Sequence, residues 1–225
     1  MLDCDCIRGW MQERPFTEPR LHLQKQDTQS CAWKRLLELI EAAAADGREE
    51  FSPGVELQED WSEILTLPPT ISNLKRVKHL NVYGSHLVRL PPEIGEMTDL
   101  RVFTPCTSSS LHWFPYEITR CRKLKESTVS TRALYGNWKL RAPFPRLPSL
   151  ADSIIPAACS VCAGPFRSSG PQQWWISLRV ATDVIPLLVH ACSEDCVKRL
   201  PPSPKGYVRS PHRGGFELQQ PETGL

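Results

Sequence analysis

The stretch Leu67-Pro68-Pro69-Thr70-Ile71 decides the fold, because it returns further along the chain at a nearly fixed interval. It recurs as Leu90-Pro91-Pro92-Glu93-Ile94, 23 residues later, and more weakly as Phe114-Pro115-Tyr116-Glu117-Ile118, another 24 residues on. A period of this length is typical of repeat architectures, in which each unit adds one copy of the same small structure.

Apolar residues extend the match over further positions of each unit. Three rows align, which are Ile71, Leu74, Val77 and Leu80; Ile94, Met97, Leu100 and Phe103; and Ile118, Cys121, Leu124 and Ser127. Behind them lie Leu87, Leu111 and Leu134, and an incomplete unit upstream contains Leu57, Ile64 and Leu67. A single unit cannot bury its own apolar edge, so neighbouring units must stack to form a shared core.

Residues 57–137 resemble leucine-rich repeats, specifically the short 23-residue type whose units open with Leu-Pro-x-x-Ile. The resemblance implies an α/β fold, a short solenoid. Each unit should give a strand, near residues 78–83, 101–106 and 125–130, and then a turn and an irregular or 3₁₀ return. The family carries Asn after the strand, where this chain has Ser85, then Ser108 or Ser109, and then Arg132. Ser127 also stands where an apolar strand residue belongs.

Residues 28–50 predict an amphipathic helix that caps the array. An apolar stripe recurs at helical spacing and consists of Trp33, Leu36, Leu37, Ile40 and Ala44. Asp27, Thr28 or Ser30 suits the N-cap, and Gly47 suits the position after the last turn. Because the end of a solenoid exposes its core, we expect the stripe to cover the first unit. Binding of a partner along the stripe is the alternative.

Four cysteines form two close pairs. Cys159 and Cys162 are followed, thirty residues later, by Cys192 and Cys196. The first spacing predicts a tight knuckle, and the second puts both thiols on one face of a helical turn. Four thiolates can close a tetrahedral zinc site with no open position for water, so we predict one structural Zn²⁺ ion. Unligated thiols and a redox Cys-x-x-Cys pair are the alternatives, and His190 could replace one thiol.

The segments around these cysteines resemble small treble-clef zinc fingers. Residues 159–166 are similar to the zinc knuckle of such fingers, and residues 191–196 to the Cys-Ser-x-x-Cys helix start of TRASH- and MYM-like fingers. That family usually has an aromatic residue before the second pair, where this chain has Ala191. Between the pairs, residues 174–180 and 184–189 predict a hairpin that turns at Thr182-Asp183. The predicted zinc module spans residues 157–200.

The remaining segments are predicted to be tails and a linker around an array that spans residues 51–140. Residues 1–27 show no periodicity and predict a mobile N-terminal tail, in which Cys4 and Cys6 are a minor candidate for metal binding. Prolines concentrate in residues 143–171 and 201–221. They predict a Pro-rich linker over residues 141–156 and a disordered tail over residues 201–225.

Composition and motifs disfavour several classes of function. The formal net charge of +2 gives no strong field for nucleic acid or an acidic membrane. We find no apolar run as long as a membrane helix and no signal peptide, and we expect a cytoplasmic protein. The sequence has no Gly-rich phosphate loop, Gly-x-Ser-x-Gly or His-Glu-x-x-His, so no enzyme activity is expected.

We therefore predict a non-catalytic adaptor that binds a protein or peptide. Period-two alternation along the strands predicts a concave binding surface of His79, Asn81, Tyr83, Val102, Thr104, Glu126 and Thr128. An array this short could also leave that face unused. The rival function is nucleic-acid binding through the zinc module and a basic convex face of Lys75, Arg76, Lys78, Arg120, Arg122, Lys123 and Lys125.

Overall fold

The computed structural model describes residues 19–147 and 155–222. The chain divides into two compact units. The first, called here the repeat unit, comprises residues 24–130 and 180–183. The second, the cysteine unit, comprises the described parts of residues 1–23, 131–179 and 184–225. Most of the predicted N-terminal tail, with Cys4 and Cys6, and residues 148–154 of the predicted linker lie outside the described residues.

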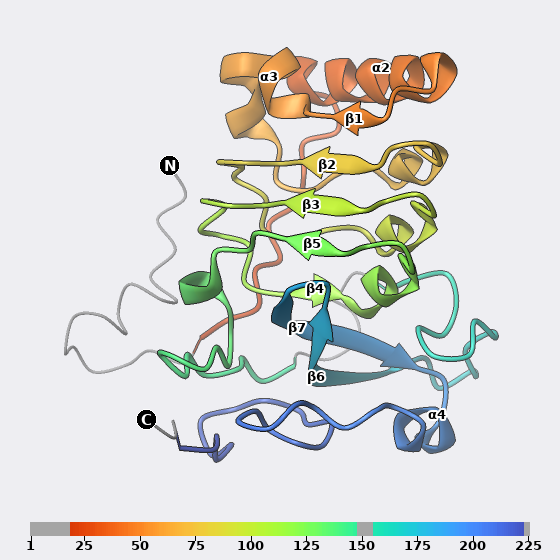
Figure 1. Cartoon of the computed structure of the whole chain (residues 1–225). Helices are drawn as coiled ribbons and strands as arrows, with labels where there is room; N and C mark the ends of the chain where they lie inside the picture. Colours follow the sequence, from red (N-terminus) through yellow and green to blue (C-terminus); the bar gives the residue numbers. More distant parts are fainter. Residues whose placement is uncertain (1–18, 148–154, 223–225) are drawn as a thin grey trace. The chain divides into compact units, whose positions relative to one another are not determined.

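A parallel four-stranded sheet runs through the repeat unit (Figure 1), which gives the chain its mixed α/β character. Its strand order is β1 (Glu50–Phe51), β2 (His79–Asn81), β3 (Val102–Thr104) and β5 (Glu126–Ser127). The 3₁₀ helices η3 (Pro69–Asn73), η4 (Pro92–Glu96) and η5 (Tyr116–Arg120) precede β2, β3 and β5, and β4 (Phe114–Pro115) leads into η5. Strands β2, β3 and β5 lie inside the three ranges predicted from the sequence.

The strand register reproduces the sequence repeat. Leu80 pairs with Phe51 on one side and with Phe103 on the other. All three side chains are fully buried, and so are most of the aligned apolar positions: Ile71, Leu74, Val77, Leu87, Ile94, Met97, Leu100, Leu111, Ile118, Cys121 and Leu134. Leu124, in the last row, is half-buried. Most of the aligned apolar positions therefore belong to the core of the repeat unit.

Ser127 ends the core row Phe51–Leu80–Phe103 because its neighbours are polar. The serine Oγ donates to Asp183 Oδ2 at 2.7 Å, and its carbonyl accepts from Thr182 Oγ1 at 2.8 Å. Both partners belong to residues 180–183 of the same compact unit. A hydroxyl can satisfy these groups and an aliphatic side chain cannot.

Serines stand where the family carries asparagine, and Ser85 and Ser108 form buried hydrogen bonds between two successive copies of the sequence repeat. Ser108 Oγ donates to the carbonyl of Val82 at 3.1 Å and accepts the amide of Ser85 at 3.2 Å. The hydroxyls of Ser85 and Ser108 lie 2.6 Å apart, and both side chains are buried. Ser109 is exposed, so Ser108 is the structural counterpart of Ser85.

The predicted first helix is α2 (Cys31–Asp46), which lies along the β1 side of the sheet (Figure 1). Ser30 is its N-cap and accepts the amide of Trp33 at 3.2 Å, while Gly47 ends it with a left-handed φ of 65°. Its buried residues are Ala32, Trp33, Leu36, Ile40 and Ala43. Leu37 and Ala44 of the predicted stripe are only half-buried, because the buried face is centred on Leu36 and Ile40.

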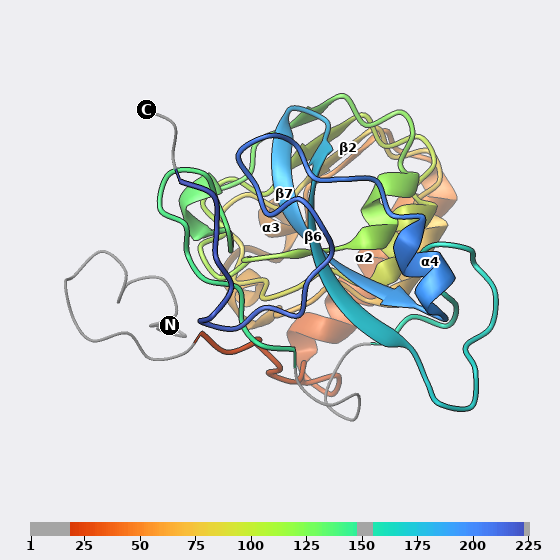
Figure 2. The same cartoon turned by 90° about the horizontal axis from the view of Figure 1, so that it is seen from below.

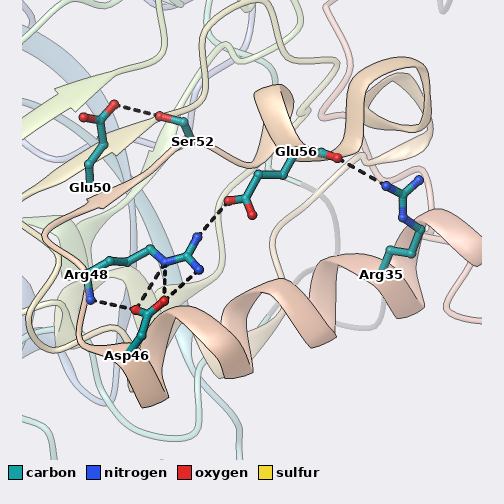
Figure 3. A network of polar contacts seen from close by, with 6 residues as sticks. All are labelled: Arg35, Asp46, Arg48, Glu50, Ser52 and Glu56. Atoms are coloured by element: carbon teal, nitrogen blue, oxygen red, sulfur yellow. Dashed lines mark hydrogen bonds and ion pairs between the residues drawn. The ribbon is translucent and has the colours of Figure 1, made fainter.

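Ion pairs connect α2 to the next two helices, α3 (Pro53–Leu57) and η2 (Gln58–Glu63). Arg48 pairs with Asp46 at 2.8 Å and with Glu56 at 3.0 Å. Arg35 donates to the backbone carbonyl of Glu56 at 3.2 Å (Figure 3), and it also pairs with Asp60. These contacts join both ends of α2 to the α3–η2 segment.

The described cysteine unit contains the 3₁₀ helix η6 (Thr131–Ala133), most of the hairpin β6 (Gln172–Val180) and β7 (Asp183–Ala191), and α4 (Glu194–Lys198). The hairpin falls where the sequence predicts it. Its core is an aromatic cluster in which Phe144 lies 5.8 Å from Trp175, 6.4 Å from Tyr135 and 4.5 Å from His212, measured between ring centroids. Part of the predicted linker thus belongs to a packed core.

The tail predicted to be disordered makes defined contacts as far as Gln220, whose side chain donates to the carbonyl of Arg141 at 2.9 Å, and that prediction is corrected. His212 pairs with Trp175 through two backbone hydrogen bonds of 2.8 and 3.0 Å. The amide of Gly215 donates to the carbonyl of Phe144 at 3.0 Å. A Cβ on Gly214 would lie 2.1 Å from the carbonyl oxygen of Pro145, so a glycine allows this close approach. Glycine in this segment therefore serves a close backbone contact and does not indicate disorder.

We expect Gly95→Ala to destabilise the repeat unit by about 2 kcal/mol. Gly95 lies in η4, and a Cβ there would lie 2.4 Å from the backbone oxygen of Glu117, which precedes Ile118 in η5. Because this neighbour is backbone, two helices would have to separate. Urea unfolding measures the effect. The control is Ser72→Ala, one unit earlier at a half-buried serine, which should cost less than about 0.5 kcal/mol. If both variants lose the same free energy of unfolding, η4 and η5 are not closely packed at Gly95.

Candidate metal centre

The four cysteines come from two segments that backbone hydrogen bonds hold together. Cys192 follows β7 directly and Cys196 lies in α4, at the end of the hairpin (Figure 2). The amide of Ser160, in the first segment, donates to the carbonyl of His190 at 2.8 Å, and Ser160 Oγ accepts the amide of His190 at 3.0 Å. These bonds fix the first pair of cysteines beside the second pair.

Local turns aim each pair of thiols at one point. The carbonyl of Cys159 accepts the amide of Ala163 at 2.9 Å, and the amide of Cys159 donates to the carbonyl of Gly164 at 2.9 Å. Ala163 adopts a left-handed φ of 57° to close this knuckle. Ser193 is the N-cap of α4, where its side chain accepts the amide of Cys196 at 3.4 Å. The predicted knuckle and helix start are therefore both present.

The sulfur positions suit a tetrahedral ion. The Sγ atoms of Cys159, Cys162, Cys192 and Cys196 all lie within 4.8 Å of one another. Cys192 Sγ lies 3.6 Å from Cys162 Sγ and 3.5 Å from Cys196 Sγ. A zinc–sulfur distance of about 2.3 Å in a regular tetrahedron separates the sulfurs by about 3.8 Å. The cluster could therefore hold a metal ion such as zinc without rearrangement of the backbone.

Hydrogen-bond donors surround the sulfurs, as is usual around ligands of a metal. The amide of Gly164 donates to Cys162 Sγ at 3.4 Å, and the amide of Cys192 to Cys159 Sγ at 3.3 Å. Arg199 Nη2 donates to Cys196 Sγ at 2.9 Å. Our sequence reasoning missed Arg199, although a basic residue one helical turn after the last cysteine was visible.

The ionisation of the thiols is uneven. Burial raises the pKa of Cys196, but hydrogen bonds from Arg199 and Cys192 outweigh it and lower the pKa to about 6. The amide of Gly164 lowers the pKa of Cys162. Hydrogen bonds with Cys196 and Cys162 raise the pKa of Cys192 to about 12. Adjacent thiolates repel one another, so the cluster reaches full ionisation only when a cation offsets the charge.

His190 lies beside the cluster and is not one of its ligands. Its Nε2 contacts the side-chain amide of Gln173 at 3.1 Å, and its imidazole is almost fully buried. Burial lowers the pKa of His190 to about 4, so the ring is neutral at pH 7. Among the described residues, only the four cysteines form a group of three or more potential metal ligands.

Five of the seven predicted partner-binding residues lie in register on parallel strands, and Tyr83 and Thr128 lie just beyond the ends of β2 and β5. The surface of these seven residues is called here the strand face. His79 pairs in register with Val102, which pairs with Glu126, and Asn81 pairs with Thr104. Tyr83 is 60% exposed, Glu126 and Thr128 are exposed, and the other four are half-buried. His79 Nε2 contacts Thr104 Oγ1 at 2.9 Å, so part of this face already makes internal contacts.

The predicted basic patch is largely neutralised by neighbouring carboxylates. Lys75 pairs with Glu96 at 3.1 Å. Lys78 pairs with Glu49, and Lys123 with Asp99. Arg120 lies 4.0 Å from Glu117, whereas Arg76, Arg122 and Lys125 are exposed. Alternating charge of this kind is a poor template for a phosphate backbone.

A comparison with known protein families finds no match to the sequence, and a comparison with curated proteins finds none either. In the part of the chain that the structure describes, no helix is both long and apolar enough to cross a membrane.

Proposed function

We propose that this chain is a non-catalytic, cytoplasmic adaptor. In this proposal the repeat unit is a short leucine-rich-repeat solenoid whose strand face binds a protein or peptide, and the four cysteines hold one structural zinc ion. The observation that carries the proposal is the strand register, in which five of the seven predicted contact residues pair with one another across parallel strands.

Three features of the repeat unit support a solenoid. The parallel strands follow one another in chain order, with a 3₁₀ helix before each of β2, β3 and β5. The Ser85–Ser108 ladder joins equivalent turns of adjacent units. Thr107, with φ 63°, occupies the turn position that Gly84, with φ 64°, occupies one unit earlier. The same backbone conformation thus recurs with the period of the sequence.

The chemistry of the strand face suits a protein partner. The face combines one exposed aromatic ring, Tyr83, with hydroxyl, amide and imidazole groups, and Glu126 is its one carboxylate. Exposed aromatic side chains carry much of the binding energy in protein interfaces. The amide of Tyr83 donates to Asn81 Oδ1 at 3.1 Å, which orders the backbone that presents the ring.

The zinc ion in this proposal is structural. Four thiolates complete a tetrahedral shell, so a bound zinc ion has no vacant position for a reacting water molecule. Two of the four sulfurs belong to buried residues, Cys159 and Cys196. The ion would join the knuckle to α4 across the end of the hairpin.

We expect Tyr83→Ala to weaken binding of the partner by about tenfold or more, since removal of an interface anchor typically costs over 1 kcal/mol. Affinity capture with the intact chain from its native extract identifies the partner, and calorimetry measures the affinity. Val55→Ala is the matched control, because Val55 is 73% exposed in the same unit but lies in α3, away from the strand face.

Both variants should keep the melting temperature of the native chain. If Tyr83→Ala binds like the native chain while charge reversal at Arg122 and Lys125 abolishes binding, the strand face is not the binding surface.

A further inference from the structure

The two units carry opposite formal charge. The described residues of the cysteine unit contain 12 Lys and Arg against 4 Asp and Glu, a net charge of +8. The repeat unit contains 13 against 16, a net charge of −3. The chain total of +2 therefore conceals a strongly basic unit. A zinc ion with four thiolates contributes a formal −2, which leaves about +6.

The acidic groups in the described part of the cysteine unit are too few to neutralise its positive charge. Of the four acidic residues described there, Glu217 pairs with Arg146 and Asp195 lies 3.8 Å from Lys198. The net charge of +8 also counts every histidine as neutral. Burial lowers the pKa of His212 to about 4, so this ring is neutral at pH 7.

Aromatic rings are interleaved with these cations. The Lys139 ammonium lies 5.6 Å from the centre of the Trp138 ring. The Arg141 guanidinium lies 5.7 Å from the Tyr207 ring, and the Arg213 guanidinium 5.4 Å from the Trp174 ring. Trp138 is 45% exposed and Phe216 is 49% exposed. A large flat apolar surface is therefore available beside positive charge.

The core of the cysteine unit brings these pairs into one neighbourhood, although they come from three distant segments. The Phe144 ring contacts both Trp175, the neighbour of Trp174, and His212, the neighbour of Arg213. The amide of Leu147 donates to the carbonyl of Arg213 at 3.1 Å. Residues 138–147, β6 and residues 207–215 consequently pack as neighbours around one cluster.

We propose that the cysteine unit binds single-stranded nucleic acid. Lysine and arginine side chains neutralise the phosphates, and a base stacks on Trp138. A single strand fits better than a duplex, because only an unpaired base can stack on the exposed Trp138 ring. An acidic protein would use the charge but not the stacking surface.

The intact zinc-loaded chain tests the proposal with fluorescein-labelled 20-nucleotide oligouridylate and oligothymidylate. A 20-base-pair duplex, heparin, and vesicles containing phosphatidylserine are measured in parallel. Two sets of exposed lysines and arginines are compared. The first variant replaces Lys139, Lys205 and Arg209 of the cysteine unit by Gln, and its control replaces Lys25, Lys34 and Arg101 of the repeat unit by Gln. Trp138→Ala is compared with Val55→Ala, at a 73% exposed residue of the repeat unit that lies away from the strand face.

The native chain should bind the single strands more tightly than the duplex, with a negative dependence on salt. The cysteine-unit variant should weaken binding at least tenfold and lower the slope of log K against log[salt] by about 2. Trp138→Ala should weaken single-strand binding about fivefold or more but leave heparin binding unchanged. Both controls should bind like the native chain.

Three results would overturn the proposal. The first is failure of the native chain to bind the single strands even at low salt. The second is an equal loss of binding in the two triple variants. Finally, binding to heparin or to vesicles without any effect of Trp138→Ala would assign the charge to an acidic protein or a membrane surface.

Discussion

Replacement of Cys159 by serine (Cys159→Ser) is expected to abolish zinc binding. It should unfold the metal-binding end of the cysteine unit while the repeat unit stays folded. Cys159 is completely buried, and its sulfur accepts the amide of Cys192 at 3.3 Å. Structural zinc binding contributes on the order of 10 kcal/mol to the folding of small zinc domains at pH 7. The aromatic cluster around Phe144 does not depend on the metal, so the loss should be confined to residues 155–171 and 191–200.

Elemental analysis of the native chain should give one zinc per molecule, and a chelator should reproduce the effect of Cys159→Ser. Hydrogen exchange then maps the unfolded region. Because zinc displaces protons from the thiols, its affinity should fall as the pH is lowered. Cys31→Ser is the matched control, since Cys31 is exposed and lies in α2. A zinc content near zero, with all four thiols freely reactive, would refute the metal centre.

Leu36→Asp should unfold the repeat unit, because it places a charge inside the contact between α2 and the array. The Leu36 side chain has no exposed surface. The variant loses its burial energy of about 2 kcal/mol and adds the cost of desolvating a carboxylate. A total above about 4 kcal/mol lowers the melting temperature by more than about 15 °C in a unit of this size. If the repeat unit is the short solenoid proposed above, it has few other contacts to compensate for this loss.

Circular dichroism measures this melting temperature, and Leu37→Asp is the control. Leu37 is the next residue on the same helix and is only half-buried. We expect its replacement to lower the melting temperature by a few degrees. If both variants melt like the native chain, α2 is not a cap, and its apolar stripe serves a partner.

The sequence predicted those features that are set by residues close together in the chain. The 23-residue period placed β2, β3 and β5 and the buried rows, since each row is defined by its own side chains. The two cysteine spacings predicted the thiol cluster, because a knuckle and a helical turn are both local geometries. Helical periodicity found α2 but included Leu37, since a stripe of five residues does not fix which side of the helix faces the core.

The remaining features depend on contacts between distant residues. Ser127 stands in a core row because Thr182 and Asp183, more than fifty residues away, supply hydrogen-bond partners. Gly214 in the C-terminal segment lies against the carbonyl of Pro145. Composition cannot reveal such a contact between distant residues. The net charge of the whole chain likewise concealed a basic unit, because the segments that form the unit are separated in the sequence by the more acidic repeats.

That separation has a consequence for the order in which the chain folds on the ribosome. The hydroxyl of Tyr135 donates to the carbonyl of Arg20, across 115 residues of sequence. At roughly 5–20 residues per second, residues 19–23 therefore wait several seconds after synthesis for their contacts. Residues 24–130, which form nearly all of the repeat unit, are synthesised before Cys159 and Cys162. Nascent chains thus pass through a stage in which residues 24–130 are complete while residues 19–23 still lack the segment that they contact.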